Sequence, residues 1–344
     1  MENKRVLVTG ATGFIGSHTI VELVNAGYDV VGVDNFSNSS AEVLKGIKEI
    51  IGKEIPFVEA DCSNKKDFAR VFELYTDIGA AIHFAASKAV GESVNKPLMY
   101  YRNNITSLLN LLELMQSETS QNVVFSSSCT VYGEPSPENL PVSEKAPVQP
   151  ATSPYGATKQ MSETILKDAV VANDKLKVIA LRYFNPIGAH PSSNIGELPL
   201  GVPQNLVPYI TQTAAGLRKE LSIFGNDYDT PDGTCIRDYI YVVDLAKAHV
   251  QAVKRMFEVD SDSFEIFNLG TGVGLSVQQL VDEFMKATGV KVPYKYAPRR
   301  AGDIEKVWAD PKKANEVLGW KAETPIDEIL LSAWNWEKKV RDIK

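Results

Sequence analysis

Apolar runs alternate with helical spacing through the first half of the chain. Six short runs rich in β-branched and other apolar residues predict strands at residues 5–9, 29–34, 56–61, 80–84, 122–126 and 178–182. After the first of them, Ile15, Thr19, Leu23 and Ala26 recur at helical spacing and predict a helix that stops at Gly27. Almost continuously apolar strands separated by helices are typical of a parallel sheet buried on both faces. The pattern therefore predicts an α/β fold with a doubly wound parallel sheet.

The pattern changes after the sixth predicted strand, where prolines and glycines become frequent and the regular strand–helix repeat stops. Helical spacing returns at residues 276–288 and 326–340, between strand-like pieces. We therefore predict two domains, a sheet domain at residues 1–185 and a smaller mixed α/β domain at residues 186–344. A segment at about 237–270 can return to the first domain.

Composition and charge narrow the function classes. The 344 residues are 44% hydrophobic and 23% charged, and 36 basic against 43 acidic residues give a net charge of −7. An acidic body argues against a nucleic-acid partner, although a local site can still hold a small anion. Cys62, Cys129 and Cys235 form no CxxC pair and no zinc spacing, which predicts reduced thiols in a cytoplasmic protein without a metal site. The sequence has neither a signal-peptide core nor an apolar run of about 18 residues, so we expect no membrane partner.

A glycine-rich turn links the first predicted strand to the first helix. Gly10, Gly13 and Gly16 have the spacing GxxGxxG, which allows a tight turn, a close approach of backbone N–H groups to a pyrophosphate, and helix–sheet packing. Asp34 ends the second strand, where a carboxylate accepts the ribose hydroxyls of NAD and repels the extra phosphate of NADP. Asp61 ends the third strand, as a partner of the adenine amino group or as the N-cap of the next helix. NAD is the predicted cofactor.

Polar side chains end several of the predicted strands, at the edge where ligands bind in open α/β sheets. They are Asp34, Asp61, Ser126 and Arg182. Ser128 lies at the same edge, and Tyr155 and Lys159 are four residues apart, so that they share one face of a helix. A tyrosine with a pKa of about 10 is a poor base at neutral pH, but a lysine cation and an oxidised nicotinamide both favour its phenolate. With GxxGxxG, the serine and YxxxK, the chain resembles the extended short-chain dehydrogenase/reductase family, whose fold has a Rossmann sheet.

Longer stretches resemble the UDP-glucose 4-epimerase family and cover nearly the whole chain. They are residues 85–92 (AASKAVGE), 125–133 (FSSSCTVYG), 153–159 (SPYGATK), 181–191 (LRYFNPIGAHP), 223–228 (IFGNDY), 232–239 (DGTCIRDY) and 297–303 (APRRAGD). This resemblance implies an isomerase that reversibly interconverts UDP-glucose and UDP-galactose, with bound NAD as a transient hydride acceptor. It implies that Tyr155 takes the proton of the sugar 4-hydroxyl, that Ser128 hydrogen-bonds the same oxygen, and that Lys159 lowers the pKa of Tyr155.

The resemblance also implies further contacts, residue by residue. On the cofactor side it points to Gly10, Gly13, Phe14, Ile15, Gly16, Asp34, Asn35, Ser39, Asp61, Cys62, Phe84, Ala85, Lys88, Asn103, Tyr155, Lys159 and Phe184. On the substrate side it points to Lys88, Ser128, Tyr155, Asn185, Asn205, Leu206, Phe224, Arg237, Arg300, Asp303 and Val307. In this set Arg237 and Arg300 match contacts to the diphosphate, Asp303 matches a contact to the uridine ribose, and Phe224 lies in the segment that receives the uracil.

Two further features of the sequence bear on the substrate range and on the oligomeric state. A bulky tyrosine at the position of Val307 narrows the sugar pocket in this family, so a valine predicts that N-acetylated UDP-sugars are also accepted; alternatively, Val307 is only a core strand residue. Relatives form homodimers through helices that match residues 97–116 and 154–172. The first of these has more apolar residues than one buried stripe needs, although the same residues can also face the sheet. They are Leu108, Leu109, Leu111, Leu112 and Met115.

Three other functions remain open on this fold. A nucleotide-sugar 4,6-dehydratase needs an added acid and base, which relatives place directly after the serine, where this chain has Cys129 and Thr130. A uronate epimerase needs a cation for the sugar carboxylate, and the sequence identifies none. A non-catalytic NAD-sensing regulator typically lacks the tyrosine or the lysine, and both are present here as Tyr155 and Lys159.

Overall fold

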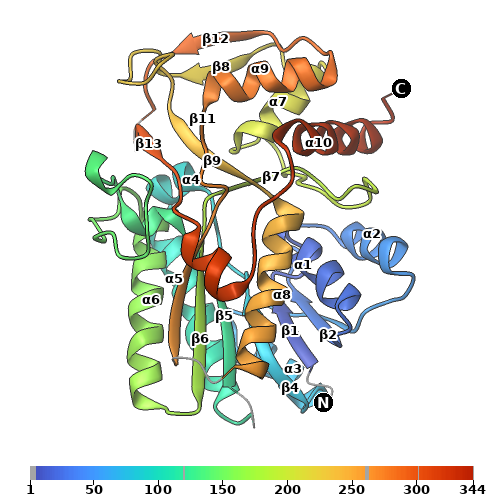
Figure 1. Cartoon of the computed structure of the whole chain (residues 1–344). Helices are drawn as coiled ribbons and strands as arrows, with labels where there is room; N and C mark the ends of the chain where they lie inside the picture. The colour runs from blue at the N-terminus through green and yellow to red at the C-terminus, as the bar shows by residue number, and fades with distance from the viewer. Residues whose placement is uncertain (1–4, 119–120, 260–262, 301, 344) are drawn as a thin grey trace.

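The computed structural model describes residues 5–118, 121–259, 263–300 and 302–343. A parallel seven-stranded sheet is covered by helices on both faces, and a smaller lobe lies over one edge of it (Figure 1). Across the sheet, the strands are β10 (Phe264–Leu269), β6 (Leu176–Tyr183), β5 (Gln121–Ser128), β4 (Ile78–His83), β1 (Arg5–Thr9), β2 (Val30–Asp34) and β3 (Phe57–Glu59). The strand order reverses between β1 and β4, and such a point opens a ligand crevice at the carboxyl ends of the strands.

The predicted α/β fold class is confirmed, and each of the six predicted strands forms. The seventh strand, β10, was not predicted, because it follows β6 only after an excursion through the smaller lobe. The helix α8 (Val242–Glu258) precedes it and packs on the large sheet beside α1 (Phe14–Asn25). The chain thus returns from the smaller lobe to the large sheet within residues 237–270. The proposed domain boundary at residue 185 stays a prediction.

Side chains that alternate along the strands build a separate core on each face of the sheet. In β1, Val6 and Val8 face a cluster formed with α1 and α8, whereas Leu7 faces a cluster on the other side. The first face carries α1, α8 and α2 (Glu42–Ile51). The second carries α3 (Lys65–Leu74), α5 (Pro97–Met115) and α6 (Pro154–Ala172). Because both faces are buried, the strands are apolar almost throughout, as the sequence pattern indicated.

The apolar side of α5 faces the sheet rather than solvent. Four of the five apolar residues singled out on this helix are buried in its second core, namely Leu108, Leu111, Leu112 and Met115. Only Leu109 of the five is substantially exposed, at 41%. The view that these residues exceed one buried stripe is therefore wrong for four of them, because a helix wedged between the sheet and α6 buries a wide face.

The smaller lobe combines two short sheets with three helices (Figure 1). One sheet contains β11 (Gly274–Ser276), β9 (Ile236–Tyr241), β13 (Lys306–Val307) and β7 (Asn185–Ile187), and the other pairs β12 (Tyr294–Ala297) with β8 (Leu221–Phe224). Its helices are α7 (Leu206–Ala214), α9 (Val277–Thr288) and α10 (Ile326–Val340), which share one apolar cluster. Shorter helical turns are α4 (Val90–Asn95), Cys129–Tyr132, Pro137–Asn139 and Ala314–Leu318. Within the described residues, no helix has the length and apolar character needed to cross a membrane.

Candidate active site

The glycine turn after β1, which is called the cradle below, consists of residues 10–16. Its backbone packs so closely that a side chain at Gly10 or Gly16 would clash with neighbouring atoms. A Cβ on Gly16 would lie 2.1 Å from the carbonyl oxygen of Gly10, so the third glycine lets α1 approach the turn. Gly10 has a φ of +68° and lies against the backbone of Phe84 and Ala85. The N-cap of α1 is Gly13, which supplies no side-chain cap. This helix end therefore offers backbone N–H groups and a favourable dipole to an anion.

Asp34 lies at the end of β2 directly beside this turn. Its Oδ2 accepts a hydrogen bond from the backbone N–H of Thr12 at 3.1 Å, and its Oδ1 accepts from Phe36 N at 2.9 Å and Ser39 Oγ at 3.3 Å. Asn35 is exposed beside it, and its Oδ1 accepts from Ser37 N. The structure thus brings Asp34, Asn35 and Ser39 together next to the glycine turn.

Asp61 and Cys62 follow β3 at the same edge. Asp61 Oδ1 accepts from the N–H and hydroxyl of Ser63, each at 2.8 Å. The alternative role of Asp61 as a helix N-cap is wrong, because Asn64 caps α3. Cys62 is buried, and burial raises the pKa of its thiol. The contact of Asp61 with the adenine and that of Cys62 with the cofactor stay predictions.

The segment after β4 brings further candidates to the crevice. Phe84 and Ala85 touch the glycine turn, and Lys88 Nζ lies 5.7 Å from the ring centroid of Phe14 at the start of α1. Asn103 reaches back from α5, where its Nδ2 donates to Ser87 Oγ at 3.2 Å. The next residue of α1, Ile15, is half-buried and packs, like Phe14, against the apolar cluster of the smaller lobe.

The three expected catalytic residues meet where β5 and α6 face each other. Ser128 ends β5, and its Oγ accepts from Thr130 N at 3.2 Å. Ser153 caps α6, so that Tyr155 and Lys159 occupy its first turns. Lys159 is buried, its Nζ donates to the carbonyl oxygen of Ser126, and it lies 5.8 Å from the ring centroid of Tyr155.

Burial dominates the protonation of this group. It raises the pKa of Tyr155 to about 12, although the hydrogen bond with Ser128 acts in the opposite direction. It lowers the pKa of Lys159 to about 7, and the negative charge of Glu163 opposes that change. Desolvation of the phenol outweighs the other influences on its pKa, and the lowering of that pKa by Lys159 stays a prediction.

The smaller lobe places the expected substrate residues above the crevice. Arg300 forms an ion pair with Asp303 at 2.7 Å, and its guanidinium lies 5.7 Å from the ring centroid of Phe224 at the end of β8. Arg237 lies on β9 beside Val307 on β13 and donates from NH1 to the carbonyl oxygen of Ile236 at 2.8 Å. The remaining expected residues in this lobe are Asn185 on β7, Asn205 at the N-cap of α7, and Leu206, which packs against the lobe's apolar cluster.

Val307 is a buried strand residue. It is 3% exposed and belongs, with Phe184, Val131, Tyr132 and Ala309, to a small apolar cluster. This position agrees with the alternative interpretation, in which Val307 is a core strand residue. A role in sugar selection stays a prediction, as does the contact of Phe184 with the cofactor.

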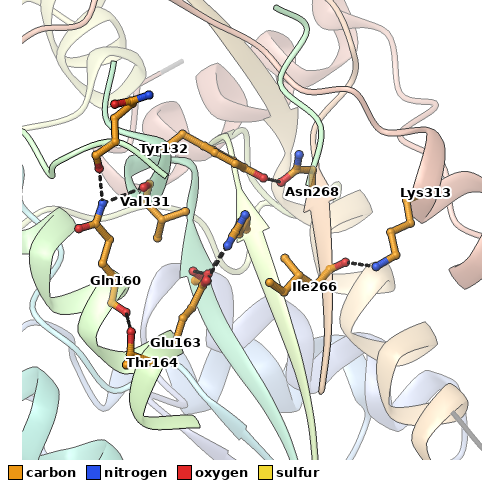
Figure 2. A network of polar contacts seen from close by, with 11 residues as sticks. Val131, Tyr132, Gln160, Glu163, Thr164, Ile266, Asn268 and Lys313 are labelled. Atoms are coloured by element: carbon orange, nitrogen blue, oxygen red, sulfur yellow. Dashed lines mark hydrogen bonds and ion pairs between the residues drawn. The ribbon is translucent and has the colours of Figure 1, made fainter. Parts of the chain in front are cut away.

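The prediction that Arg182 lies at the ligand edge is wrong. β6 continues through Tyr183, so Arg182 lies inside the strand, and its guanidinium forms a buried ion pair with Glu163 of α6 at 2.6 Å. Ser127 Oγ donates to the same carboxylate at 2.6 Å. Figure 2 shows Glu163 pointing from α6 towards the sheet. The sequence carried a signal for Glu163, because it follows Lys159 by four residues on the same helix face.

Glu197 was also missed. Its Oε1 accepts from Lys88 Nζ at 3.0 Å and from Asn205 Nδ2 at 2.5 Å, and its backbone oxygen accepts from Trp336 Nε1. This carboxylate joins one residue expected at the cofactor to another expected at the substrate, across the gap between sheet and lobe. No local pattern marks Glu197, since two of its three partners, Lys88 and Trp336, are more than 100 positions away in sequence.

Comparisons with known proteins agree with this geometry. A family model described as GDP-mannose 4,6 dehydratase matches residues 7–332. The UDP-glucose 4-epimerase of Bacillus subtilis is 51% identical over 332 residues, which cover 96% of each chain. The crystal structure of UDP-glucose 4-epimerase from Bifidobacterium longum in complex with NAD+ and UDP has a TM-score of 0.94 and 46% identity, covering 99% of this chain and 100% of that chain. The UDP-Glc/GlcNAc 4-epimerase from Campylobacter jejuni has a TM-score of 0.82 and 36% identity, covering 98% and 99%.

The parallel sheet, its glycine turn and the Ser128, Tyr155 and Lys159 group define an enzyme of the extended short-chain dehydrogenase/reductase class. Within that class, the chain belongs to the UDP-glucose 4-epimerase family.

Proposed function

We propose that this protein interconverts UDP-glucose and UDP-galactose by NAD-dependent epimerisation at C4. The observation that carries the proposal is the meeting of Ser128, Tyr155 and Lys159 at the end of β5, at the same edge of the sheet as the glycine turn. The lobe above them presents Arg237 and Arg300, which suit a diphosphate. A fixed nucleotide and a loosely held sugar suit a reaction in which the sugar must present both faces to one hydride donor.

The chain's own residues fit NAD. The glycine turn, against which Gly16 lets α1 pack closely, and the uncapped N-terminus of α1 would hold the pyrophosphate. Asp34, held beside that cradle, would accept the adenosine ribose hydroxyls. When bound, NAD supplies a hydride acceptor and a positively charged ring that lowers the pKa of a nearby phenol.

The roles of the three site residues follow from their protonation. The Tyr155 phenol, with its pKa raised to about 12 by burial, needs added positive charge before its oxygen can accept the proton of the sugar 4-hydroxyl. Ser128, which hydrogen-bonds Tyr155, would orient that hydroxyl. Lys159 would hold the nicotinamide ribose and contribute positive charge while it is protonated, because its Nζ is fixed by Ser126. Returning the proton from Tyr155 to the sugar oxygen completes the cycle.

The alternatives fit the site less well. A 4,6-dehydratase needs acid–base groups directly after the serine, but burial raises the pKa of Cys129 to about 12, and Thr130 is no acid. A uronate substrate needs a cation for its carboxylate, and Lys88, Arg182 and Arg300 are each already paired with a carboxylate. An NAD-sensing regulator has no need for the Tyr155 and Lys159 pair.

One assay tests the proposed function. The purified protein is incubated with UDP-glucose without added NAD, and the sugar nucleotides are separated by chromatography. We expect UDP-galactose to accumulate to an equilibrium mixture, because hydride removed from C4 returns to the same carbon and no net oxidant is consumed. Failure to form UDP-galactose, even with added NAD, would contradict the proposal.

The substrate range is part of the same proposal. We expect the assay to convert UDP-N-acetylglucosamine as well, because the side chain at position 307 is a valine and not a bulky tyrosine. The likeness to the Campylobacter jejuni protein, which is named for both sugars, supports this. Absence of UDP-N-acetylgalactosamine under conditions that convert UDP-glucose would show that another residue closes the pocket.

We further propose a homodimer formed through α5 and α6, in the cytoplasm. The helices pack side by side, and large apolar side chains remain exposed on them, among them Leu109 at 41% and Met161 at 48%. Leu109→Glu combined with Met161→Glu should convert the dimer to a monomer in sedimentation velocity, because a charge is costly in an apolar interface. Leu217→Glu changes a leucine outside these helices that is 54% exposed, and it should leave the dimer intact. A monomeric wild-type protein would refute the proposal.

A further inference from the structure

We propose that Glu163 is a positioning residue of the epimerase site: its buried carboxylate ties the Lys159-bearing face of α6 to β5 and β6 and presents a negative charge to the Lys159 ammonium. The inference rests on the proposed function, in which Lys159 acts as a cation. Glu163 is 4% exposed and follows Lys159 by four residues, about one helical turn. Charged residues are almost never buried so completely without a partner.

The contacts of Glu163 join α6 to β5 and β6 next to the residues of the proposed active site. Its Oε1 accepts from Ser127 Oγ at 2.6 Å and from Arg182 Nε at 2.9 Å, and its Oε2 accepts from Arg182 NH2 at 2.6 Å. Ser127 precedes Ser128 in β5, and Ser126, which fixes Lys159, precedes Ser127. One carboxylate therefore fixes α6 against the strand that carries Ser128.

A second row of contacts holds Arg182 from the far side. Its guanidinium lies 4.7 Å from the ring centroid of Tyr132, whose hydroxyl donates to Asn268 Oδ1 at 2.6 Å (Figure 2). Asn268 Nδ2 donates to the carbonyl oxygen of Val142 at 2.8 Å. These contacts fix the guanidinium of Arg182, and the ion pair with Arg182 in turn fixes the position of the Glu163 carboxylate.

Apart from Arg182 and Glu163, the titratable groups placed against Lys159 and Tyr155 are uncharged near neutral pH, among them Cys129, whose pKa is raised by burial. On β4, burial and Lys159 lower the pKa of His83 to about 3, so its imidazole is neutral. Burial raises the pKa of Tyr100 on α5 and of Tyr183 on β6. Arg182 is the remaining cation, and it is paired with Glu163. Glu163 thus supplies the negative charge that acts on Lys159, and it opposes the lowering of the lysine pKa by burial.

The test separates this role from ordinary structural support. Three variants are compared with the wild-type protein: Glu163→Gln, the double variant Glu163→Leu with Arg182→Leu, and Glu265→Gln. Glu163→Gln leaves Arg182 buried without a counter-ion and lowers the Tm. The double variant removes both charges, so its Tm returns towards that of the wild type. Glu265→Gln breaks another buried ion pair, that with Arg255, far from Lys159.

Two readouts report on Lys159. One is the titration midpoint of its Nζ by NMR of lysine-labelled protein, assigned with Lys159→Met, and the other is the pH profile of kcat with UDP-glucose. A lysine is charged below its pKa, so loss of the nearby carboxylate should move the midpoint and the alkaline limb of the profile to lower pH by about one unit. We expect the full shift in Glu163→Gln and a smaller shift in the same direction in the double variant, because the positive charge of Arg182 is removed together with the nearer negative charge of Glu163. Glu265→Gln should show no shift.

Recovery of both the Tm and the wild-type midpoint in the double variant would overturn the inference, because Glu163 would then have only a structural role. An unchanged midpoint in Glu163→Gln would overturn it as well. A wild-type protein that forms no UDP-galactose would instead refute the proposed function, while the NMR midpoints still decide whether Glu163 acts on Lys159.

Discussion

Replacing Tyr155 with phenylalanine should lower kcat for UDP-glucose by about 10²- to 10⁴-fold, the usual contribution of a general base. The phenyl ring occupies the same half-buried position at the start of α6, so the fold, the NAD content and the KM should change little. Only the oxygen that exchanges a proton with the sugar is lost. The measurement is initial-rate formation of UDP-galactose, together with the NAD content of the purified protein.

Tyr75→Phe is the matched control for this experiment. Tyr75 is the C-cap residue of α3, and its ring lies 5.0 Å from the guanidinium of Arg5 at the start of β1, away from the crevice. Loss of its hydroxyl should leave kcat at the wild-type level. Wild-type turnover by Tyr155→Phe would remove Tyr155 from the mechanism, and a protein that keeps NAD without any turnover in its wild-type form would favour the sensor.

The parts of the fold that the sequence predicted are those set by local pattern. Strands buried on both faces leave a short apolar run, and α1 shows its helical spacing, so β1 to β6 and the first helix could be located. β10 could not, because its run is interrupted by Glu265 and Asn268, whose partners are Arg255 and Tyr132. Sheet order is a property of pairing over long distances, which local patterns do not contain.

The same limit applies to the site: residues with a local sequence signal were located, and residues whose position depends on the fold were not. Ser128, Tyr155 and Lys159 were located because they are carried by a strand end and one helix face. Arg182 was misplaced because a polar residue near a strand end does not reveal whether the strand continues or which face the side chain takes. Glu197 was missed because its role depends on a contact with Lys88, which lies 109 positions away in the sequence.

The glycine turn offers the second large effect, on stability and cofactor retention together. In Gly16→Ala, the added Cβ would lie 2.1 Å from the Gly10 carbonyl oxygen, a separation that real Cβ atoms do not adopt. The helix α1 must therefore move away from the turn or the turn must open, and either change displaces the N–H groups at the helix start. We expect the free energy of unfolding to fall by about 3 kcal/mol, the upper end of the usual cost of overpacking. Denaturant unfolding measures it, and the NAD content of the purified protein should fall at the same time.

Gly91→Ala provides the comparison that isolates the cradle. Gly91 is an exposed residue of α4, where the nearest atom to an added Cβ is Gln204 Oε1 at 3.8 Å, an ordinary contact. Alanine is the better helix former by about 1 kcal/mol, so this variant should be as stable as the wild type or slightly more so. If Gly16→Ala matched it in stability and NAD content, α1 would not depend on close approach to the turn. The third glycine would then give no support to the assignment of this turn to the pyrophosphate, which would rest on the N-terminus of α1 alone.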